Sequence, residues 1–329
     1  MTEKNKCRAI AGIVYAVGLG LILAEFAGCK AREKIFTIGI VSEVSLNAEV
    51  LEGFKQGMIE LGYIEGKNLM YINKSVKMLD KQDIEAGIKE VLSQDIDILL
   101  TLGRSVPIGA KELVKGTDMP VLFCGDAWPV EDGLVESLIH PGGNIVGVRA
   151  AESLPKALEW LVKIVPGAIK IWVPYNPDDN VSVSDIRHLE KAASPLGVEF
   201  VLHETRSVEE AVAAIGDLPK DIDAIFLVPS PTLNPGSEKL SQAAISRGIP
   251  VGASIRLDES ILITLTSDFI DAGKKAARLA QRIHEDGIKP ADLPVETSEV
   301  RLIINVKTAE EIGIVIPDNI LGQATTIIR

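Results

Sequence analysis

Cysteine, histidine and aromatic residues are scarce in this sequence of 329 residues. It contains three cysteines, Cys7, Cys29 and Cys124, and four scattered histidines, and aromatic residues make up 4%. Three cysteines without a paired spacing supply neither a zinc site nor a disulfide framework. No histidine has a second metal-binding residue three or four positions away, and the sequence contains neither a GxSxG motif nor a cysteine–histidine signature. We therefore expect no metal site, no cofactor and no enzymatic activity.

Basic residues are also in the minority. The chain has 34 Lys and Arg residues against 46 Asp and Glu residues, which gives a formal net charge of −12. Contacts with nucleic-acid phosphates require a basic surface, so we expect no nucleic-acid partner. The acidity favours solubility and does not by itself identify a partner.

The most apolar run stands at the N-terminus. Residues 9–24 (AIAGIVYAVGLGLILA) follow a short basic leader and precede Phe26-Ala27-Gly28-Cys29. This order is typical of an export signal, and its last four residues resemble a lipoprotein cleavage box. We expect residues 1–28 to be a lipoprotein signal peptide, Cys29 to be lipidated, and the protein to be extracytoplasmic and membrane-anchored. The alternative is an uncleaved anchoring helix. Cys124, inside the apolar run VLFC, is expected to pack in a core.

The rest of the chain alternates between apolar β-branched runs and segments with helical spacing. In the first half, strands are expected at 36–42, 68–73, 96–103 and 119–126, with helices at 50–62, 83–94 and 106–116. In the second half, strands are expected at 169–177, 198–204, 223–230, 250–254 and 261–267, with helices at 154–167, 181–197, 208–218 and 237–248. Such alternation predicts parallel sheets that are covered on both faces. Two runs of it predict an α/β fold of two doubly wound parallel-sheet lobes.

Ligands of open parallel sheets bind beyond the carboxyl ends of the strands. Polar and aromatic residues follow those ends in both halves. We expect the ligand-binding residues to be Ser42, Arg104, Ser105, Asp126, Trp128, Asp179, Ser230, Ser254, Arg256 and Asp268.

Several of these residues have a structural alternative. Arg104 could grip a carboxylate or phosphate with its guanidinium fork, or pair with a cleft acid such as Asp126 or Asp179. Trp128 could stack on a ring of the ligand, or pack in the interior beside Pro129. Asp179 lies between a strand and a helix, so it could bind ligand or cap the helix.

The remaining candidates are polar residues of the same loops. Ser42, Ser105 and Ser230 could hold a ligand oxygen at a helix start, through the hydroxyl or the backbone N–H. Ser254 and Arg256 follow a strand of the second half, in the loop SIRLDES.

Four stretches carry a family resemblance. These are GFKQGMIELGYIEGKNL (53–69), PGGNIVGV (141–148), DGIKPADLPVET (286–297) and IINVKTAEEIGIVIP (303–317). With them the chain resembles, from about Ile35 to Pro317, the ABC-transporter substrate-binding proteins of the tryptophan/tyrosine-receptor-like family, which have the type 1 periplasmic binding fold. The resemblance implies two lobes joined by several crossing strands, a closing cleft, and delivery of a small-molecule solute to an ABC permease in the membrane.

The departures from the family pattern fall in the expected cleft. Arg104 replaces a threonine of the family, Trp128 replaces an aspartate and Val181 replaces an asparagine. Pro231 replaces the aspartate that the resemblance implies would hold an amino group. Asp179 stands where a glutamate is common, and Asp268-Phe269 match the family's aspartate–tyrosine pair. The exchange at Pro231 argues against an amino-acid ligand. Arg104 and Trp128 favour a small anionic or zwitterionic solute with an apolar or aromatic part.

We predict a linker at 29–34, an N-terminal lobe of residues 35–147 plus 271–294, and a C-terminal lobe of residues 148–270 plus 295–329. The predicted function is a monomeric, lipid-anchored solute-binding protein of an ABC uptake transporter. The alternative is a ligand-sensing module that reports to a membrane receptor or kinase. The chain ends soon after the fold is complete, which favours the carrier.

Overall fold

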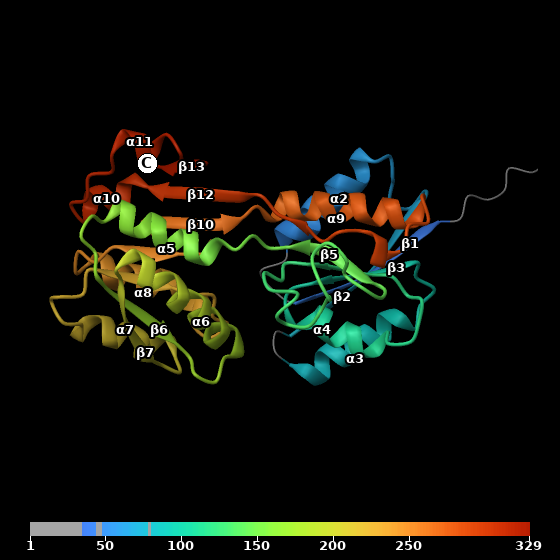
Figure 1. The fold of residues 1–329 in the computed structure, drawn as a ribbon, viewed down its shortest axis with the longest axis horizontal. Helices are drawn as coiled ribbons and strands as arrows, with labels where there is room; N and C mark the ends of the chain where they lie inside the picture. Colours follow the sequence, from blue (N-terminus) through green and yellow to red (C-terminus); the bar gives the residue numbers. More distant parts are fainter. Residues whose placement is uncertain (1–34, 44–47, 78–79) are drawn as a thin grey trace, which may run out of the picture.

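The computed structural model describes residues 35–43, 48–77 and 80–329, which form two α/β lobes lying side by side (Figure 1). The expected signal peptide, the linker and Cys29 lie outside the described residues. Within the described ranges, no helix combines the length and the apolar character needed to cross a membrane.

The first lobe is built on a six-stranded sheet. Its strands are β1 (Phe36–Glu43), β2 (Leu69–Val76), β3 (Ile98–Leu102), β4 (Val121–Cys124), β5 (Ile145–Arg149) and β11 (Glu296–Thr297), in the order β11-β5-β4-β3-β1-β2. Every pair is parallel. All residues of β3 and β4 are buried, as expected for central strands that are covered on both faces.

Helices cover both faces of this sheet. Helices α2 (Ala48–Glu60) and α9 (Phe269–His284) share one core with the sheet, and α3 (Lys81–Leu92) and α4 (Ser105–Leu113) share another on the opposite face. Helix α9 belongs to this lobe although most of the second lobe precedes it in the sequence. It is followed by the short helix η2 (Pro290–Asp292) and by β11.

Helices α2 and α9 touch backbone to backbone. A Cβ atom added to Gly53 would lie 2.2 Å from the Ile270 carbonyl oxygen, and one added to Gly273 would lie 2.1 Å from the Val50 carbonyl oxygen. Both distances are far below a van der Waals contact, so only glycine permits this approach. The contact fixes α9 firmly to the first lobe.

The second lobe is built on a seven-stranded sheet. Its strands are β6 (Lys170–Tyr175), β7 (Glu199–Glu204), β8 (Ala224–Leu227), β9 (Val251–Ala253), β10 (Ile263–Ser267), β12 (Val300–Asn305) and β13 (Thr326–Ile328), in the order β13-β12-β10-β9-β8-β6-β7. One pair departs from the parallel arrangement expected from the sequence, because β12 runs antiparallel to β10. Strand β10 runs toward the first lobe and β12 returns from it, so the two must point in opposite directions (Figure 1).

The second sheet is also covered on both faces. Helices α5 (Ser153–Ile164), α6 (Asn180–Leu196), α10 (Val306–Glu311) and α11 (Asp318–Leu321) contribute to one core. Helices α7 (Val208–Asp217) and α8 (Ser237–Ile245) contribute to the other, and η1 (Asn234–Gly236) leads into α8. Two doubly wound sheets confirm the fold class predicted from the sequence.

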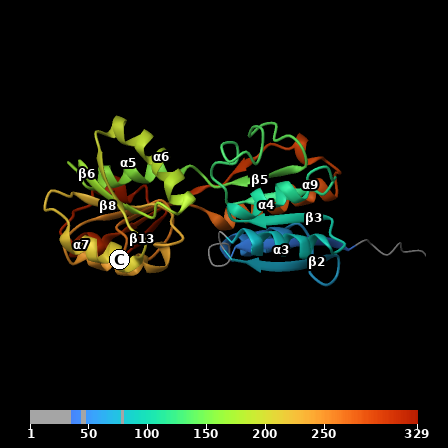
Figure 2. The ribbon, with the colours of Figure 1, turned by 90° about the horizontal axis from the view of Figure 1, so that it is seen from below.

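Three segments cross between the lobes, after β5, after β10 and after β11 (Figure 2). The backbone N–H of Ala151, on the first crossing, donates to the Ser267 hydroxyl at 2.9 Å and to the Ser298 hydroxyl at 3.1 Å. These serines lie on the other two crossings, so one amide ties all three together. The predicted lobe boundaries at 147/148, 270/271 and 294/295 lie near these crossings and stay predictions.

Cys124 is fully buried at the end of β4, which confirms the expected core position. Burial raises the pKa of its thiol to about 12. The thiol is therefore protonated at neutral pH and inert as a nucleophile.

Candidate functional site

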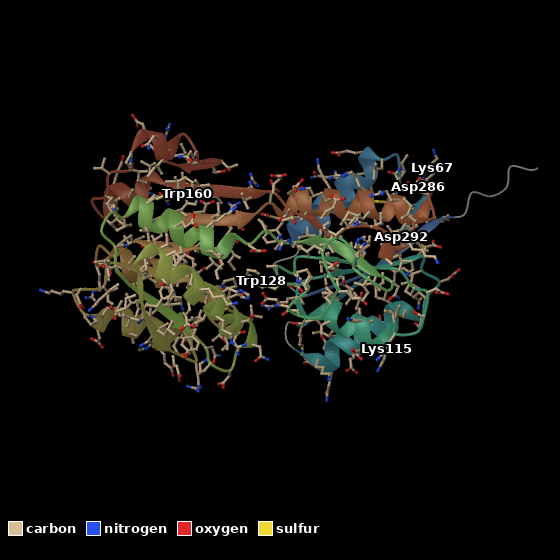
Figure 3. The ribbon with its side chains drawn as sticks, viewed as in Figure 1. Lys67, Lys115, Trp128, Trp160, Asp286 and Asp292 are labelled. Atoms are coloured by element: carbon tan, nitrogen blue, oxygen red, sulfur yellow. The ribbon has the colours of Figure 1, made fainter. Side chains whose placement is uncertain are left out.

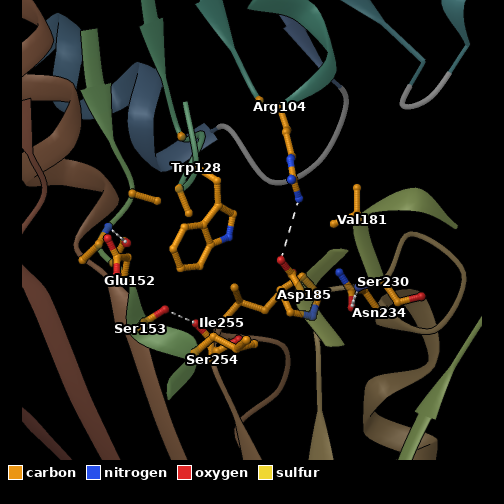
Figure 4. Close-up of a pocket in the computed structure, with 18 of the residues that line it drawn as sticks. Arg104, Trp128, Glu152, Ser153, Val181, Asp185, Ser230, Asn234, Ser254 and Ile255 are labelled. Atoms are coloured by element: carbon orange, nitrogen blue, oxygen red, sulfur yellow. Dashed lines mark hydrogen bonds and ion pairs between the residues drawn. The ribbon is translucent and has the colours of Figure 1, made fainter. Parts of the chain in front are cut away.

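A cavity of about 180 Å³ lies between the lobes, at the carboxyl ends of strands from both sheets. The first lobe lines it with the last residue of β1 and with residues that follow β3 and β4, and the second lobe with the starts of α5 and α6 and the loops after β8 and β9 (Figure 4). The inner side is closed by residues of the crossings, among them Ala151 and Ser267. A ligand in this position would touch both lobes and the hinge.

A wider hollow of about 700 Å³ lies outside this cavity, between α3, α4 and the start of α6. Arg104, Ser105 and Val181 line both spaces. These three residues therefore form the boundary between the hollow and the enclosed cavity.

Arg104 is held in place by carboxylates of both lobes. Its Nε donates to Asp132 Oδ2 at 2.6 Å and one terminal nitrogen donates to Asp132 Oδ1 at 3.0 Å, a bidentate pair within the first lobe. The same terminal nitrogen donates to Ser184 Oγ at 3.2 Å, and the other lies 3.7 Å from Asp185 Oδ1; both of these partners belong to α6. Arg104 thus pairs with cleft acids, although with neither Asp126 nor Asp179, and it bridges the lobes (Figure 4).

Asp185 projects from α6 into the cavity, and its side chain is only 10% exposed. Burial raises the pKa of this carboxyl to about 7, against the lowering effects of the Arg104 charge and of the neighbouring Trp128 side chain. The residue is therefore poised between its neutral and charged forms near neutral pH, a state common at binding sites.

Trp128 lies at the junction of the lobes (Figure 3). Its indole is stacked on the imidazole of His188 from α6, with ring centroids 3.7 Å apart and an interplanar angle of 3°. His188 Nε2 also lies 3.3 Å from Glu131 Oε2 of the first lobe. Burial lowers the pKa of His188, so the imidazole is neutral at pH 7 and the stack is a contact of two uncharged rings.

Glu43 closes the end of the cavity beside β1. Its Oε1 accepts the backbone N–H of Ser105 at 3.1 Å, which satisfies a donor at the start of α4. Burial raises the pKa of Glu43, and hydrogen bonds from Ser105 and Arg104 oppose that rise. A Cβ atom on Gly103 would lie 2.4 Å from Glu43 Oε2, and the φ of Gly103 is +105°, so glycine is required here twice over.

Asp126 lies behind the cavity wall. It is completely buried, and its Oδ1 accepts the backbone N–H of Trp128 at 2.8 Å. Its Oδ2 has no hydrogen-bond partner among the described residues. Burial and the nearby Asp132 charge raise the pKa of Asp126 to about 7. This carboxyl supports the loop that carries Trp128.

Asp179 organises the second lobe's side of the cavity. It caps α6 by accepting the Val181 N–H at 3.0 Å, and it accepts the hydroxyls of Ser182 at 2.5 Å and Ser230 at 3.1 Å. Asn234 Oδ1 in turn accepts the Ser230 N–H at 3.0 Å. The loop after β8 is thereby joined to the start of α6.

The structure brings half of the predicted binding residues to the cavity. Those that line it are Arg104, Ser105, Trp128, Ser230 and Ser254. Those that do not are Ser42, Asp126, Asp179, Arg256 and Asp268. Of the latter group, Asp268 caps α9 and Arg256 pairs with Glu259 on the surface.

Sequence reasoning did not select several residues that line the cavity. They include Glu43, Glu152, Ser153, Asp185, Asn234, Ile255 and Phe269. Glu43 and Ile255 adjoin predicted residues at strand ends, so a wider window would have found them. Asp185 lies in the second turn of a helix, where only the approach of the other lobe brings it to the site.

The described residues contain no group of three or more His, Cys, Asp or Glu side chains that could hold a metal ion. The cavity walls instead combine apolar surfaces from Leu154, Val181, Ile255 and Phe269 with a few polar groups. That combination is typical of sites for small organic molecules.

Two doubly wound lobes are joined by three crossing segments and enclose such a cavity between them. This arrangement defines a two-lobed solute-binding protein of the type 1 periplasmic binding class. A sequence model of the family described as ABC transporter substrate binding protein matches residues 34–328, and the chain belongs to this family. The resemblance stated from the sequence is confirmed.

Individual relatives agree with this assignment. The tyrosine-binding protein of Clostridioides difficile (strain R20291) is 29% identical over 283 residues, which are 85% of this chain and 80% of that protein. The ABC domain from Streptococcus pneumonia in complex with L-Trp superposes with a TM-score of 0.78 at 22% identity, over 90% of this chain and 100% of that chain. The ligand-free, open structure of a substrate binding protein with adhesive properties from Clostridium difficile gives a TM-score of 0.74 at 23% identity, over 90% and 99% of the two chains. The two structural matches establish a shared fold.

Proposed function

We propose that this protein is the solute-binding component of an ABC uptake transporter, and that it carries a small zwitterionic solute with an aromatic or apolar part in the cavity between its lobes. The observation that carries the proposal is the cavity itself, which strand ends of both lobes enclose and in which Arg104 and Asp185 face each other at 3.7 Å. Neighbouring groups of opposite charge suit a solute that carries both charges.

The cavity wall supports an aromatic or aliphatic part of the solute. Trp128, Leu154, Ile255 and Phe269 offer apolar surface around the polar groups. Since apolar area drives binding while a few polar contacts set orientation, we expect the ring or chain of the solute to lie against these residues. Pro231 replaces the aspartate expected to hold an amino group, which argued against an amino-acid ligand. The relatives named for tyrosine binding and for a complex with L-Trp nevertheless make these two amino acids the first candidates.

Closure of the lobes is the proposed mechanism. Arg104, Trp128 and Glu131 of the first lobe already contact Ser184, Asp185 and His188 of the second. A solute that touches both lobes makes some contacts only in the closed form. It therefore binds the closed form more tightly than the open form and raises the population of the closed form accordingly. The closed pair of lobes then presents one composite surface to the permease.

We also propose a location for the protein in the cell envelope. The protein acts outside the cytoplasm as a monomer, and a lipid on Cys29 holds it at the membrane next to its permease. Radiolabelled palmitate should enter the wild-type protein and not a Cys29→Ala variant; equal labelling of both would contradict the anchor.

Thermal unfolding of the full chain, purified in mild detergent, tests the proposed function. A ligand that binds only the native state at 100 times its Kd adds about 2.7 kcal/mol of stability, which is a clear rise in Tm. We expect L-tyrosine or L-tryptophan to raise the Tm, and glucose, the control, to leave it unchanged. A rise with sugars alone would contradict the proposed solute class.

A further inference from the structure

Carboxylates outnumber cations around the cavity. The charged side chains among its described lining residues are Glu43, Arg104, Glu152 and Asp185. Arg104 is therefore the single cation among them, and its fork is occupied by Asp132, which adds another negative charge. The site thus holds more carboxyl groups than cations.

The carboxylates differ in how well they are compensated. Glu152 pairs with Arg149 at 2.6 Å and its side chain is 46% exposed, so it has both a cation and water. Glu43 accepts the Ser105 N–H and packs against Gly103, so its carboxylate already helps to hold the start of α4. Asp185 is only 10% exposed, and its cationic partner Arg104 approaches it only to 3.7 Å while making its closest pair with Asp132.

The surroundings of Asp185 explain why its charge is costly. The charged groups that face it are Arg104, Asp132 and Asp179, and the Trp128 side chain lies beside it. One guanidinium shared among several carboxylates cannot offset the loss of hydration of a buried anion. The elevated pKa of Asp185 agrees with this imbalance. A second cation placed beside Asp185 would compensate the charge of this buried carboxylate.

We propose that the Asp185 carboxylate binds the ammonium group of the solute and is the residue that makes the site select for amines. This inference rests on the proposed function, since it assigns a role within the same cavity. An ammonium group donates charge-assisted hydrogen bonds to a carboxylate, which are the strongest available in a dry site. The carboxylate of a zwitterion then lies on the side of Arg104, and its side chain extends toward Ile255 and Phe269.

The test compares Asp185→Asn with the wild type by calorimetric titration of the full chain in detergent. Asparagine keeps the shape and removes the charge. The probes are the protein L-amino acids and, for each one that binds, the matched carboxylic acid without the amino group; for L-tyrosine this is 3-(4-hydroxyphenyl)propionate. Asp178→Asn is the matched control, because it makes the same exchange at an exposed carboxylate of the same lobe that pairs with Arg206 and does not line the cavity.

We expect the wild type to prefer the amino acid over its des-amino analogue by about tenfold or more, and Asp185→Asn to abolish that preference by weakening the amino acid alone. Asp178→Asn should retain the preference. Equal weakening of both ligands by Asp185→Asn, or an unchanged preference, would overturn the inference.

The wild type alone separates this inference from the proposed function. If a sugar binds the wild type and no amino acid does, this inference falls while solute binding in the cleft stands. If no solute binds a folded wild type, both fall. Thermal unfolding of each variant verifies that it folds.

Discussion

The indole of Trp128 in the first lobe lies parallel to the imidazole of His188 in the second, with ring centroids 3.7 Å apart. Because the two rings belong to different lobes, their stack exists only while the lobes are close together. Each ring also has a second cross-lobe neighbour, Asp185 for Trp128 and Glu131 for His188. The stack is therefore a direct contact between the two lobes beside the cavity.

His188→Ala should remove the ring stack and so weaken the contact between the lobes. An aromatic pair contributes about 0.5–1.5 kcal/mol beyond its buried area, so the closed population and the solute affinity should fall about two- to tenfold. Small-angle scattering of the ligand-free protein should give a larger radius of gyration for the variant. His140→Ala is the control, because His140 is exposed and uses only its backbone in hydrogen bonds to Ser137. Equal radii and affinities for His188→Ala and wild type would show that the stack does not hold the lobes.

Arg104→Ala should weaken binding of L-tyrosine by more than about tenfold, because the solute carboxylate loses a charge-assisted partner. Tyramine, which lacks the carboxylate, should lose less. Lys81→Ala is the control: Lys81 lines the outer hollow and not the cavity, so its loss should change affinity by less than about threefold. Unchanged tyrosine affinity in Arg104→Ala would exclude a contact between Arg104 and the carboxylate.

Solute affinity should depend on pH through Asp185. Its pKa is about 7 in the free protein, and a bound ammonium group stabilises the charged form and lowers that pKa. Affinity should therefore fall as the pH drops below about 7, by up to tenfold per unit, and level off above it. Isothermal titration between pH 5.5 and 8.5 measures this slope. The slope should disappear in Asp185→Asn, and an equal slope in that variant would assign the titration to another group.

Asp126→Asn should change stability in a pH-dependent way. Because the pKa of the Asp126 carboxyl is raised from its ordinary value of 3.8 to about 7, the folded protein holds this proton more tightly than the unfolded chain between those two pH values. As the pH rises through that window the folded state loses stability from this group. The variant cannot ionise, so it should be more stable than wild type by about 1–3 kcal/mol at pH 8 and nearly equal at pH 4. Urea unfolding at both pH values measures this, and a variant that is less stable at pH 8 would contradict the assignment.

Gly53→Ala should destabilise the first lobe. The added methyl group would lie 2.2 Å from the Ile270 carbonyl oxygen, so α2 and α9 must move apart, at a cost of about 1–3 kcal/mol. Gly216→Ala in α7 is the control, because nothing lies within 4 Å of its added Cβ atom. That change should be neutral or slightly stabilising. A Gly53→Ala protein as stable as the wild type in urea would show that the helix contact is more adaptable than the structure indicates.

Much of the fold could be predicted because strand periodicity and length are local signals. Apolar β-branched runs such as 98–102 and 121–124 became buried strands, and the alternation with helices gave two parallel sheets. The antiparallel strand β12 was not foreseen, since its direction depends on a crossing between lobes rather than on its own residues.

The candidate site was only partly predictable for a related reason. Arg104 and Trp128 line the cavity because they lie in the loops after the central strands β3 and β4, whose ends a sequence reveals. Asp185 and His188 occupy interior positions of a helix, and their role arises from contacts with the other lobe. Asp126 and Asp179 stand at strand ends as well, but backbone amides attract their side chains into the loops behind the cavity.

A crystal structure of the protein with the amino acid that raises its Tm most would test directly whether the cavity between the lobes is the solute site. We expect one solute molecule enclosed between the lobes, with its ammonium group within hydrogen-bond distance of the Asp185 carboxylate and its side chain against Ile255 and Phe269. A solute bound on the outer surface of either lobe, with the cavity empty, would contradict it.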